Sequence, residues 1–382
     1  MIALRAQLRQ SGWFNERVID EFNLACVLDL VALGTVADVV PLDHNNRIMV
    51  AQGLARIRVG QCCAGILALL EVSARKRDNI TASDLGFAIG PRLNAAGRLT
   101  DMSLGIECLL TDDMTRAMEI ARQLHDLNLE RRQIQSGMEL SALEDLESDL
   151  QRDRVESAAA LCLYREDWHQ GVVGILASRI KEKFHRPVIV FAPDKEGRIK
   201  GSGRSINGVH IRDVLEAISS RHPGVIEKFG GHAMAAGLSI AATDLDRFGQ
   251  LFDAQVRAIV DEEQLQGRIV TDGELMPADL NFELAQSIHR GGPWGQGFPE
   301  PLFRGEFDIV ERRIVGEKHL RLELRHSRGG AVIQAIAFNT VDDDWDEDVR
   351  RLSVVYRLDI NEFRGSRSLQ LMVEQLSPRT TA

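Results

Sequence analysis

Hydrophobic positions recur at helical spacing through the first 150 residues. The spacing predicts an amphipathic helix over residues 1–11, and residues 24–33 form an apolar run, interrupted only by Asp29, that we expect to be buried. Helices are also expected at 43–58, at 64–72, from about 81 to Pro91, and from 112 to about 150 with a potential break at Gly137.

Two segments between these helices predict turns or loops. GTVADVVPL (34–42) is rich in small and β-branched residues, and PRLNAAGRL (91–99) begins with a proline, which usually ends a helix. We therefore expect both segments to lie outside regular structure.

The pattern changes at about residue 157. AAALCLY (158–164) and PVIVFA (187–192) predict buried strands, and the intervening residues 171–184 predict a helix. A glycine-rich basic stretch at 197–206 follows, and then a helix near 209–219. The small residues of KFGGHAMAAGLSI (228–240) favour a tightly packed helix after the double glycine, and residues 243–263 predict another helix.

Short alternating segments occupy the chain from about residue 268. Several short strands in roughly a hundred residues, with a helix near 279–289, favour a small barrel of the OB type. The whole chain is therefore expected to be an α/β protein with a long connecting helix and a C-terminal β-barrel.

Composition limits the possible classes. The chain has 382 residues, of which 44% are hydrophobic and 27% charged, which suits two or three globular domains. It has no apolar run of about 18 residues, so a membrane span is excluded. The start, MIALRAQLRQ, does not have the pattern of a secretory signal, and five cysteines without a CxxC pair fit a reducing cytoplasm.

The net charge of −10 argues against a nucleic-acid-binding protein until its distribution is considered. Residues 156–240 carry 12 basic and 9 acidic side chains, a balance of +3, whereas the acidic excess lies in residues 101–155 and 241–382. Because binding depends on local charge, a phosphate-binding face outside these acidic regions remains possible.

Asp38 is the first candidate for chemistry. It follows a buried segment, and a carboxylate there can bind Mg²⁺ or Mn²⁺, which prefer oxygen ligands. The alternative is a turn or helix-terminal aspartate without such a role.

The glycine-rich stretch supplies a candidate phosphate cradle. Its members are Lys200, Ser202, Gly203, Arg204 and Ser205, because glycine lets the backbone approach a ligand and a guanidinium pairs with phosphate oxygens. The alternative is a basic surface turn.

A second cradle is predicted at Gly230, Gly231 and His232. The histidine can donate to a phosphate oxygen or to the scissile group, so we also expect a catalytic role for it. The alternative is a histidine in the core.

Two further segments contain candidate contacts. Arg92, Asn94 and Arg98 can meet a nucleic-acid backbone, although Arg98 also suits a surface salt bridge. His169 stands at an expected helix start, where Asp167 as a helix cap with Trp168 in the core is the alternative.

Aromatic residues of the C-terminal region are candidates for stacking on bases. They are Trp294, Phe298, Tyr356 and Phe363, with core packing favoured for Tyr356. The five cysteines are interpreted as packing residues.

Seven segments together resemble the RecJ family, bacterial single-stranded-DNA-specific 5′→3′ exonucleases of the DHH phosphoesterase superfamily. In chain order they are LDLVALGTVADVVPLDHNNR, GPRLNAAGRL, WHQGVVGI, HRPVIVFA, KGSGRSI, KFGGHAMAAGLS and GPWGQGFPEPLF. The resemblance extends along essentially the whole chain.

The resemblance implies a domain order. Residues 1–105 correspond to the latter part of a DHH domain, 106–154 to a connecting helix, 155–263 to a DHHA1 domain and 266–382 to a RecJ OB domain. In the family, DNA passes between the first two domains, and two Mn²⁺ or Mg²⁺ ions activate water for attack on the terminal phosphodiester.

The resemblance also implies roles for single residues and partners. Asp38 matches a metal-ligating aspartate, Ser202 and Arg204 match the residues that hold the 5′ phosphate, Arg98 matches an arginine near the substrate backbone, and His232 lies in a substrate-binding loop. Implied partners are single-stranded DNA with a 5′ end, and a single-strand-binding protein or helicase, with no membrane.

The sequence departs from the family at its metal motifs, because it contains neither a DxDG motif nor a DHH tripeptide. One carboxylate cannot hold two divalent cations. We therefore expect an N-terminally truncated chain that has little or no nuclease activity alone and exposes apolar surface.

Two other functions remain open. One is a phosphodiesterase of the same superfamily that acts on oligoribonucleotides or cyclic dinucleotides, although the barrel and long connector argue against it. The other is a non-catalytic module that binds single strands, which the absent metal motifs favour.

Overall fold

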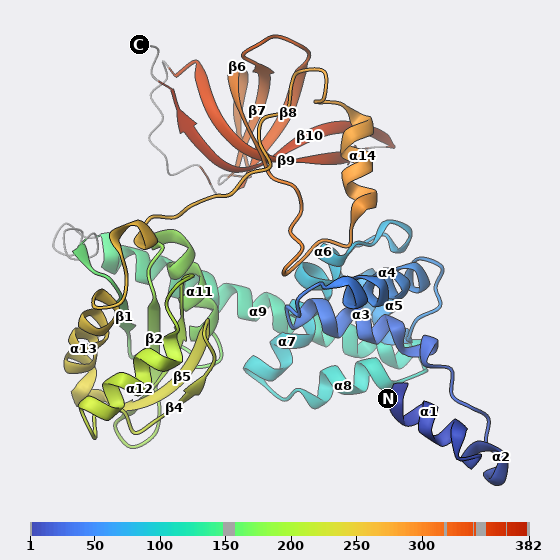
Figure 1. Ribbon diagram of the computed structural model, residues 1–382, viewed down its shortest axis with the longest axis horizontal. Coiled ribbons are helices and arrows are strands. Elements are labelled where there is room, and N and C mark those ends of the chain that lie inside the picture. Colours follow the sequence, from blue (N-terminus) through green and yellow to red (C-terminus); the bar gives the residue numbers. More distant parts are fainter. Residues whose placement is uncertain are drawn as a thin grey trace. The chain divides into compact units, whose positions relative to one another are not determined.

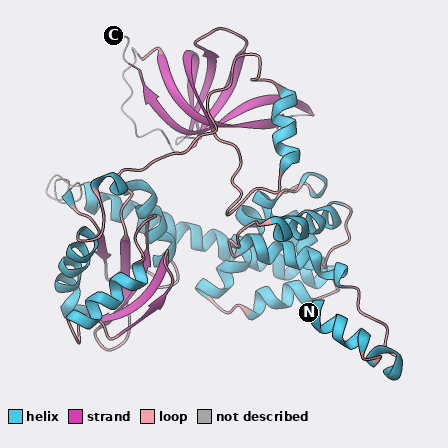
Figure 2. Cartoon of the chain, viewed as in Figure 1, coloured by secondary structure: helices cyan, strands magenta, loops and turns pink. Residues whose placement is uncertain are grey.

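Helices make up the first part of the chain, as the hydrophobic spacing predicts (Figures 1 and 2). The computed structural model describes residues 2–147, 157–316, 319–338, 340, 349–363 and 365–379. They fold as two compact units, of which one combines Met1–Gly90 with Ile269–Ala382 and the other is Pro91–Arg268. Residues 91–105, expected with the first domain, therefore belong to the second unit.

The helical part of the first unit is built from short elements. They are α1 (Ile2–Gln10), α2 (Trp13–Arg17), η1 (Leu24–Val27), α3 (Leu28–Ala37), α4 (His44–Arg58), α5 (Ala64–Val72), η2 (Arg77–Asn79), α6 (Ala82–Asp84) and η3 (Leu85–Ile89). Asp29 is buried, and its Oδ2 accepts a hydrogen bond from the Cys63 backbone N–H at 2.8 Å. Exposed apolar side chains are also present, Val18 and Phe87 among them.

The segment at 34–42 is less irregular than predicted, because α3 continues through Ala37. The helix ends when Val39 adopts a left-handed conformation (φ 55°), and the N–H groups of Val39 and Val40 bond back to Val36 and Thr35. A β-branched residue is strained in this conformation. The turn is thus confined to the residues beside Asp38.

The predicted loop at 91–99 is wrong. Thr81 and Asp84 form a capping box, η3 is one π-helical turn, and α7 (Gly90–Leu99) continues directly from it. Proline has no N–H, but the first turn of a helix does not need one, and Pro91 occupies the first turn of α7. The proline therefore begins a helix here and does not end one.

The long helix is confirmed, but without the potential break. After α8 (Ser103–Leu110), α9 runs from Met114 to Glu147 as one helix. Gly137 is exposed, and a Cβ atom added there would meet nothing within 4 Å. The predicted connector extends to 154, and its residues 148–154 lie outside the described part of the chain.

The second unit contains a five-stranded sheet of order β1-β2-β3-β5-β4 (Figures 1 and 2). Its remaining elements are β1 (Leu161–Tyr164), α11 (Val173–Phe184), β2 (Val188–Pro193), β3 (Arg198–Arg204), α12 (Ile211–Arg221), β4 (Lys228–Gly231), β5 (Ala235–Ala241), η4 (Ala242–Asp244), α13 (Leu245–Arg257) and η5 (Glu262–Leu265). The predicted strand–helix–strand unit is confirmed, since β1 and β2 are parallel and α11 joins them.

Helices cover both faces of this sheet. Ile189 and Phe191 of β2 face the core shared with α12 and α13, whereas Val188 and Val190 face α9 and α11. A strand that is buried on both faces has apolar residues at successive positions. This explains why the continuous apolar run at 187–192 correctly predicts β2.

Two glycine-rich segments that did not predict strands are strands. The basic stretch at 197–206 contains β3, and KFGGHAMAAGLSI forms the β4–β5 hairpin, so the predicted small-residue helix is wrong. Along β5, Ala236, Leu238 and Ile240 are buried in alternation, which is the period of a strand.

The C-terminal barrel is confirmed. Strands β6 (Phe303–Val315), β7 (His319–His326), β8 (Val332–Ala337), β9 (Arg351–Phe363) and β10 (Ser366–Pro378) close in the order β10-β8-β7-β6-β9, and α14 (Phe282–Gly291) packs on this core. Tyr356 is fully buried, which confirms core packing.

Two helical glycines give opposite expectations for stability. A Cβ at Gly53 of α4 would lie 2.2 Å from the Leu28 carbonyl oxygen, so Gly53→Ala should lower the free energy of unfolding by about 2 kcal/mol or more. Gly137→Ala should raise it by about 0.5–1 kcal/mol, because alanine restricts the unfolded chain. Urea denaturation of both variants measures the difference, and equal effects would contradict the close α3–α4 contact.

Candidate functional site

Two arginines of the second unit, at 98 and 204, have no carboxylate partner among the described residues. Arg98 of α7 and Arg204 of β3 are half-buried, and burial lowers the pKa of each guanidinium. The positive charge of Arg98 lowers the pKa of Arg204 further. Their hydrogen bonds in the described part of the unit go to neutral oxygens only, so this positive charge is not neutralised locally.

Strand β3 presents different residues on its two faces. Lys200, Ser202 and Arg204 alternate with Gly201 and Gly203, which face the core; a Cβ at Gly203 would lie 2.6 Å from Ile211 Cδ1. The glycine at 203 therefore serves close packing under the strand. The polar side chains are left on the face that α11 covers.

The first turn of α11 lies against this polar face. A Cβ at Gly174 would lie 2.9 Å from Arg204 Nη2 and 3.0 Å from Ser202 Oγ. Arg204 Nη1 in turn donates to Ser202 Oγ at 3.1 Å and to the Gly203 carbonyl at 2.8 Å. A guanidinium, a hydroxyl and the positive end of a helix dipole therefore meet at one place, which suits a phosphate group.

Arg98 is held against the loop before α11. Its Nη1 donates to the Gly171 carbonyl at 3.4 Å, and a Cβ at Gly171 would lie 2.1 Å from the Arg98 carbonyl oxygen. His169 Nδ1 accepts the Gly171 N–H at 3.0 Å. Arg98, His169 and Gly171 line an open depression of about 720 Å³, together with Glu166, Trp168, Gln170 and Pro193. Trp168 is buried, as the alternative interpretation predicts. Its other part is wrong, because Asp167 does not cap the helix: α11 begins at Val173, and Val172 is its N-cap.

His232 is exposed in the β4–β5 turn at the same end of the sheet as Arg204. Its backbone N–H donates to Ala235 O at 2.8 Å, and Ala235 is the β5 residue paired with Arg204. Gly231 has φ 147° and would place a Cβ 2.4 Å from Ala235 O, so the turn requires glycine there. Gly230 has open space around it.

Other predicted residues lie outside this group or at its edge. The Ser205 hydroxyl is buried and donates to Val209 O at 2.6 Å. Arg92 Nε donates to His125 Nδ1 at 3.1 Å. Asn94 is half-buried on α7, one turn before Arg98. Lys200 pairs with Asp194 at 3.2 Å. The pKa of the Asp194 carboxyl is held below its usual value by the Lys195 backbone N–H and, after it, by the Lys200 side chain.

Asp38 belongs to the first unit and is exposed at the end of α3. No group of three or more His, Cys, Asp or Glu side chains within the described ranges is arranged to hold a metal ion. The donor set of the described residues therefore does not fit a two-metal centre.

A loop after α14 braces the segment that follows Asp38. The Leu42 N–H donates to Gln296 O at 2.6 Å, the Arg47 guanidinium lies 3.5 Å above the Phe298 ring, and Phe298 stacks on Trp294 at 4.9 Å. These two rings, predicted as candidates for base stacking, are thus engaged inside the protein. The side chain of Phe363 lies outside the described residues.

Four of the five cysteines are buried or half-buried, whereas Cys26 is exposed, so the predicted packing role is wrong for Cys26. Burial raises the pKa of Cys62 to about 12 and also raises the pKa of Cys63. A thiol is nucleophilic only as the thiolate, so these two agree with a packing role.

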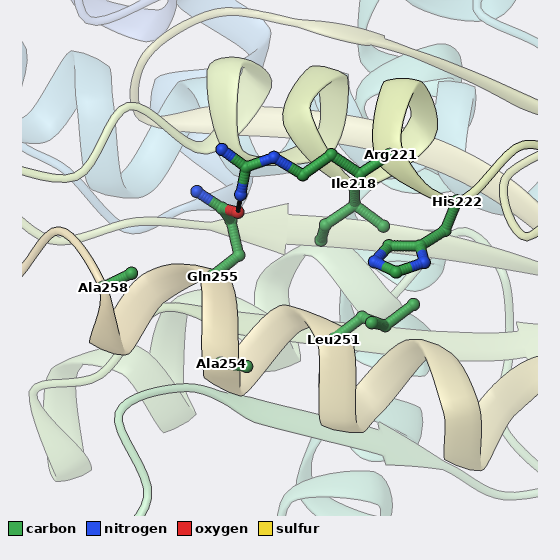
Figure 3. A pocket seen from close by; sticks show the side chains of 7 residues that line it. All are labelled: Ile218, Arg221, His222, Leu251, Ala254, Gln255 and Ala258. Carbon is green, nitrogen blue, oxygen red and sulfur yellow. Dashed lines mark hydrogen bonds between the residues drawn. The ribbon is translucent and has the colours of Figure 1, made fainter.

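A smaller pocket of about 170 Å³ lies between α12 and α13 (Figure 3). Arg221 Nη1 donates to Gln255 Oε1 at 2.7 Å across it, with His222 beside them. These helices cover the other face of the sheet from α11, so this pocket is separate from the arginine group.

Sequence reasoning missed Gly171, Gly174 and Arg131, a third half-buried arginine on α9. The sequence pattern could have indicated the two glycines, because both stand in HQGVVG next to the predicted helix start. No pattern distinguishes Arg131, since it is one of many charged residues on a long helix.

Comparison with known domains defines the class of the chain. Residues 157–258 match the DHHA1 domain and residues 271–375 match the RecJ OB domain. The sequence is 55% identical over 379 residues to the single-stranded-DNA-specific exonuclease RecJ of Dickeya dadantii and 54% identical to that of Escherichia coli. Each match covers 99% of this chain and 66% of the relative.

A solved structure agrees with these matches. The crystal structure of RecJ in complex with Mg²⁺ from Thermus thermophilus superposes with a TM-score of 0.77 at 28% identity, covering 97% of this chain and 54% of that one. The chain belongs to the RecJ family. In the described residues, no helix is long and apolar enough to span a membrane.

The phosphate-binding geometry predicts that a polyanion stabilises the protein. Pyrophosphate at about a hundred times its Kd should raise the free energy of unfolding by about 2.7 kcal/mol, measured against chloride of equal ionic strength. Gly174→Ala should weaken pyrophosphate binding about tenfold with the fold intact, because its methyl group displaces the flexible Arg204 guanidinium. Unchanged pyrophosphate affinity in this variant would count against the site, and Gly137→Ala serves as the control.

Proposed function

We propose that this chain binds the 5′ end of single-stranded DNA and presents it for hydrolysis, as part of a 5′→3′ exonuclease that acts in DNA repair and recombination. The observation that supports this proposal is the pairing of Arg98 and Arg204 near Ser202 and the first turn of α11, without a carboxylate partner. The relatives from Dickeya dadantii and Escherichia coli are single-stranded-DNA-specific exonucleases, which agrees with it.

A terminal phosphate suits this group better than an internal one. A phosphomonoester carries close to two negative charges at neutral pH, whereas each internal phosphodiester carries one. The Arg204 fork can bind two of its oxygens, and the Ser202 hydroxyl and the Gly174 N–H can donate to the third. Arg98 and Arg204 repel each other in the free protein. A terminal phosphate, which is more negative than an internal one, relieves more of this repulsion and therefore binds with a more favourable free energy.

The other predicted residues have proposed roles around this centre. His232 donates to a phosphate oxygen or to the scissile group from the same end of the sheet, and Lys200 adds positive charge at the edge. The backbone at Gly203, Gly230 and Gly231 lies along the cradle, and Arg92, Asn94 and Ser205 contribute at most outer contacts, given their present hydrogen bonds and burial.

Hydrolysis needs metal ions that this donor set does not hold. Relatives have been solved with Mg²⁺ and with Mn²⁺, and two such ions would supply an activated water and stabilise the leaving oxygen. Asp38 offers one oxygen ligand, and we derive no step from it alone. We propose a single-strand-binding protein or a helicase as partners, and the cytoplasm as the location.

A second candidate function is favoured by the same donor set: a module that binds single strands without cutting them. It shares the phosphate site and differs only in the absence of metal chemistry. A phosphodiesterase for oligoribonucleotides or cyclic dinucleotides is less suited, because the barrel matches the RecJ OB domain.

A nuclease assay tests whether the chain cuts single-stranded DNA by itself. The purified chain with Mn²⁺ and a 5′-phosphorylated single strand should release little or no mononucleotide, because the described residues contain no group of three or more His, Cys, Asp or Glu that could hold a metal ion. Binding of the same strand, measured in parallel, shows that the protein is competent. Robust Mn²⁺-dependent release would refute the binding-only function.

The role of Arg204 predicts a change in end preference. Arg204→Gln should lower the preference for 5′-phosphorylated over 5′-hydroxyl strands about tenfold, because a charge-assisted fork is lost. Fluorescence anisotropy with both strands measures this ratio. Arg198→Gln is the matched control, since Arg198 lies at the other end of β3 and pairs with Glu227 at 3.1 Å. An equal loss on both strands would contradict the end-binding role.

A further inference from the structure

Arg131 is held in a fixed orientation on α9 by two side-chain amides. Its Nη1 donates to Gln135 Oε1 at 2.7 Å, and its Nη2 donates to Asn128 Oδ1 at 2.8 Å. Asn128 is itself buried, with 3% of its surface exposed. Partners one turn before and one turn after Arg131 on the same helix therefore fix the guanidinium plane.

Nothing in the described part of the chain neutralises this guanidinium. Both hydrogen-bond partners are uncharged, and Arg131 is half-buried. Burial lowers its pKa most, followed by the positive charges of Arg98, Arg132 and Arg179. A half-buried cation surrounded by like charges is costly, and an anion bound there would remove the cost.

Helix α9, which carries Arg131, packs against α11 in a shared core. The first turn of α11 in turn contacts Arg204 and Ser202 through Gly174. The charge of Arg98 acts on both Arg204 and Arg131, which agrees with this packing. A single strand whose end is at Arg204 can therefore continue toward α9.

We propose that Arg131, oriented by Asn128 and Gln135, binds an internucleotide phosphate of the single strand. The inference rests on the proposed function, because the strand end at Arg204 sets the register. Such a contact recognises a phosphodiester and not a base, so it favours polymers over mononucleotides without adding sequence preference. It also gives the long helix a direct part in substrate binding.

The test uses Arg131→Gln and, as matched control, Arg132→Gln. The control removes the same charge from the next residue, which is exposed. The probe is a short 5′-phosphorylated oligothymidylate, measured by anisotropy without metal. Arg131→Gln should weaken binding about tenfold and reduce the salt slope by about 1, whereas Arg132→Gln should weaken binding less than about twofold.

Neutral linkages locate the contact. A set of the same strands each carries one methylphosphonate, placed in turn at each linkage near the 5′ end. One position should weaken binding to the unmodified protein about as much as Arg131→Gln does, and the same position should cause no further loss in that variant. Arg131→Lys, which keeps the charge and loses the fork, should couple to the same linkage if Arg131→Gln does not fold.

Three outcomes would overturn the inference: equal losses in Arg131→Gln and Arg132→Gln, no linkage coupled to Arg131, or loss of the 5′-phosphate preference in Arg131→Gln. The last would assign Arg131 to the strand end. A different result would contradict the proposed function: Arg204→Gln would retain the preference for a 5′-phosphate while one linkage still couples to Arg131. The Arg131 contact and the proposed function are therefore tested separately.

Discussion

The second unit depends on bringing positive groups close together without negative partners. Two glycines make this possible: Gly171 lets its loop approach the Arg98 carbonyl, and Gly174 leaves room for Arg204 and Ser202 beside α11. Because the guanidinium groups are half-buried, water stabilises them less than it would at an open surface. The fold thus maintains an arrangement that favours an anionic ligand.

The sheet supports this arrangement through the alternation of β3. Its glycines, at 201 and 203, face Phe191 and Ile211 in the core, so the polar residues of the strand must face α11. The core under one face and the charged group on the other are therefore set by the same seven residues. A change that shifts the strand by one residue would exchange the two faces.

Local patterns predicted much of the fold, whereas contacts distant in sequence explain the rest. The strand–helix–strand unit, the long helix and the barrel follow from apolar spacing. The loop predicted at 91–99 is wrong because a proline can stand at the start of a helix as well as after its end. The helix predicted at β5 is wrong because small residues occur in both helices and strands. Residue chemistry and the family resemblance both indicated Arg98, Ser202 and Arg204, but only the structure joins them to Gly174 and Arg131, which come from other elements.

The contact between the barrel-side loop and the segment after Asp38 affects how the protein can be divided. Residues 291–298 are separated from Leu42 and Arg47 by some two hundred and fifty positions, yet they provide a backbone acceptor and an aromatic face to them. Removing the C-terminal region from residue 269 onward, which includes this loop, would remove both contacts from the segment after Asp38. Dissection experiments on this family should therefore not treat the helical part as an independent module.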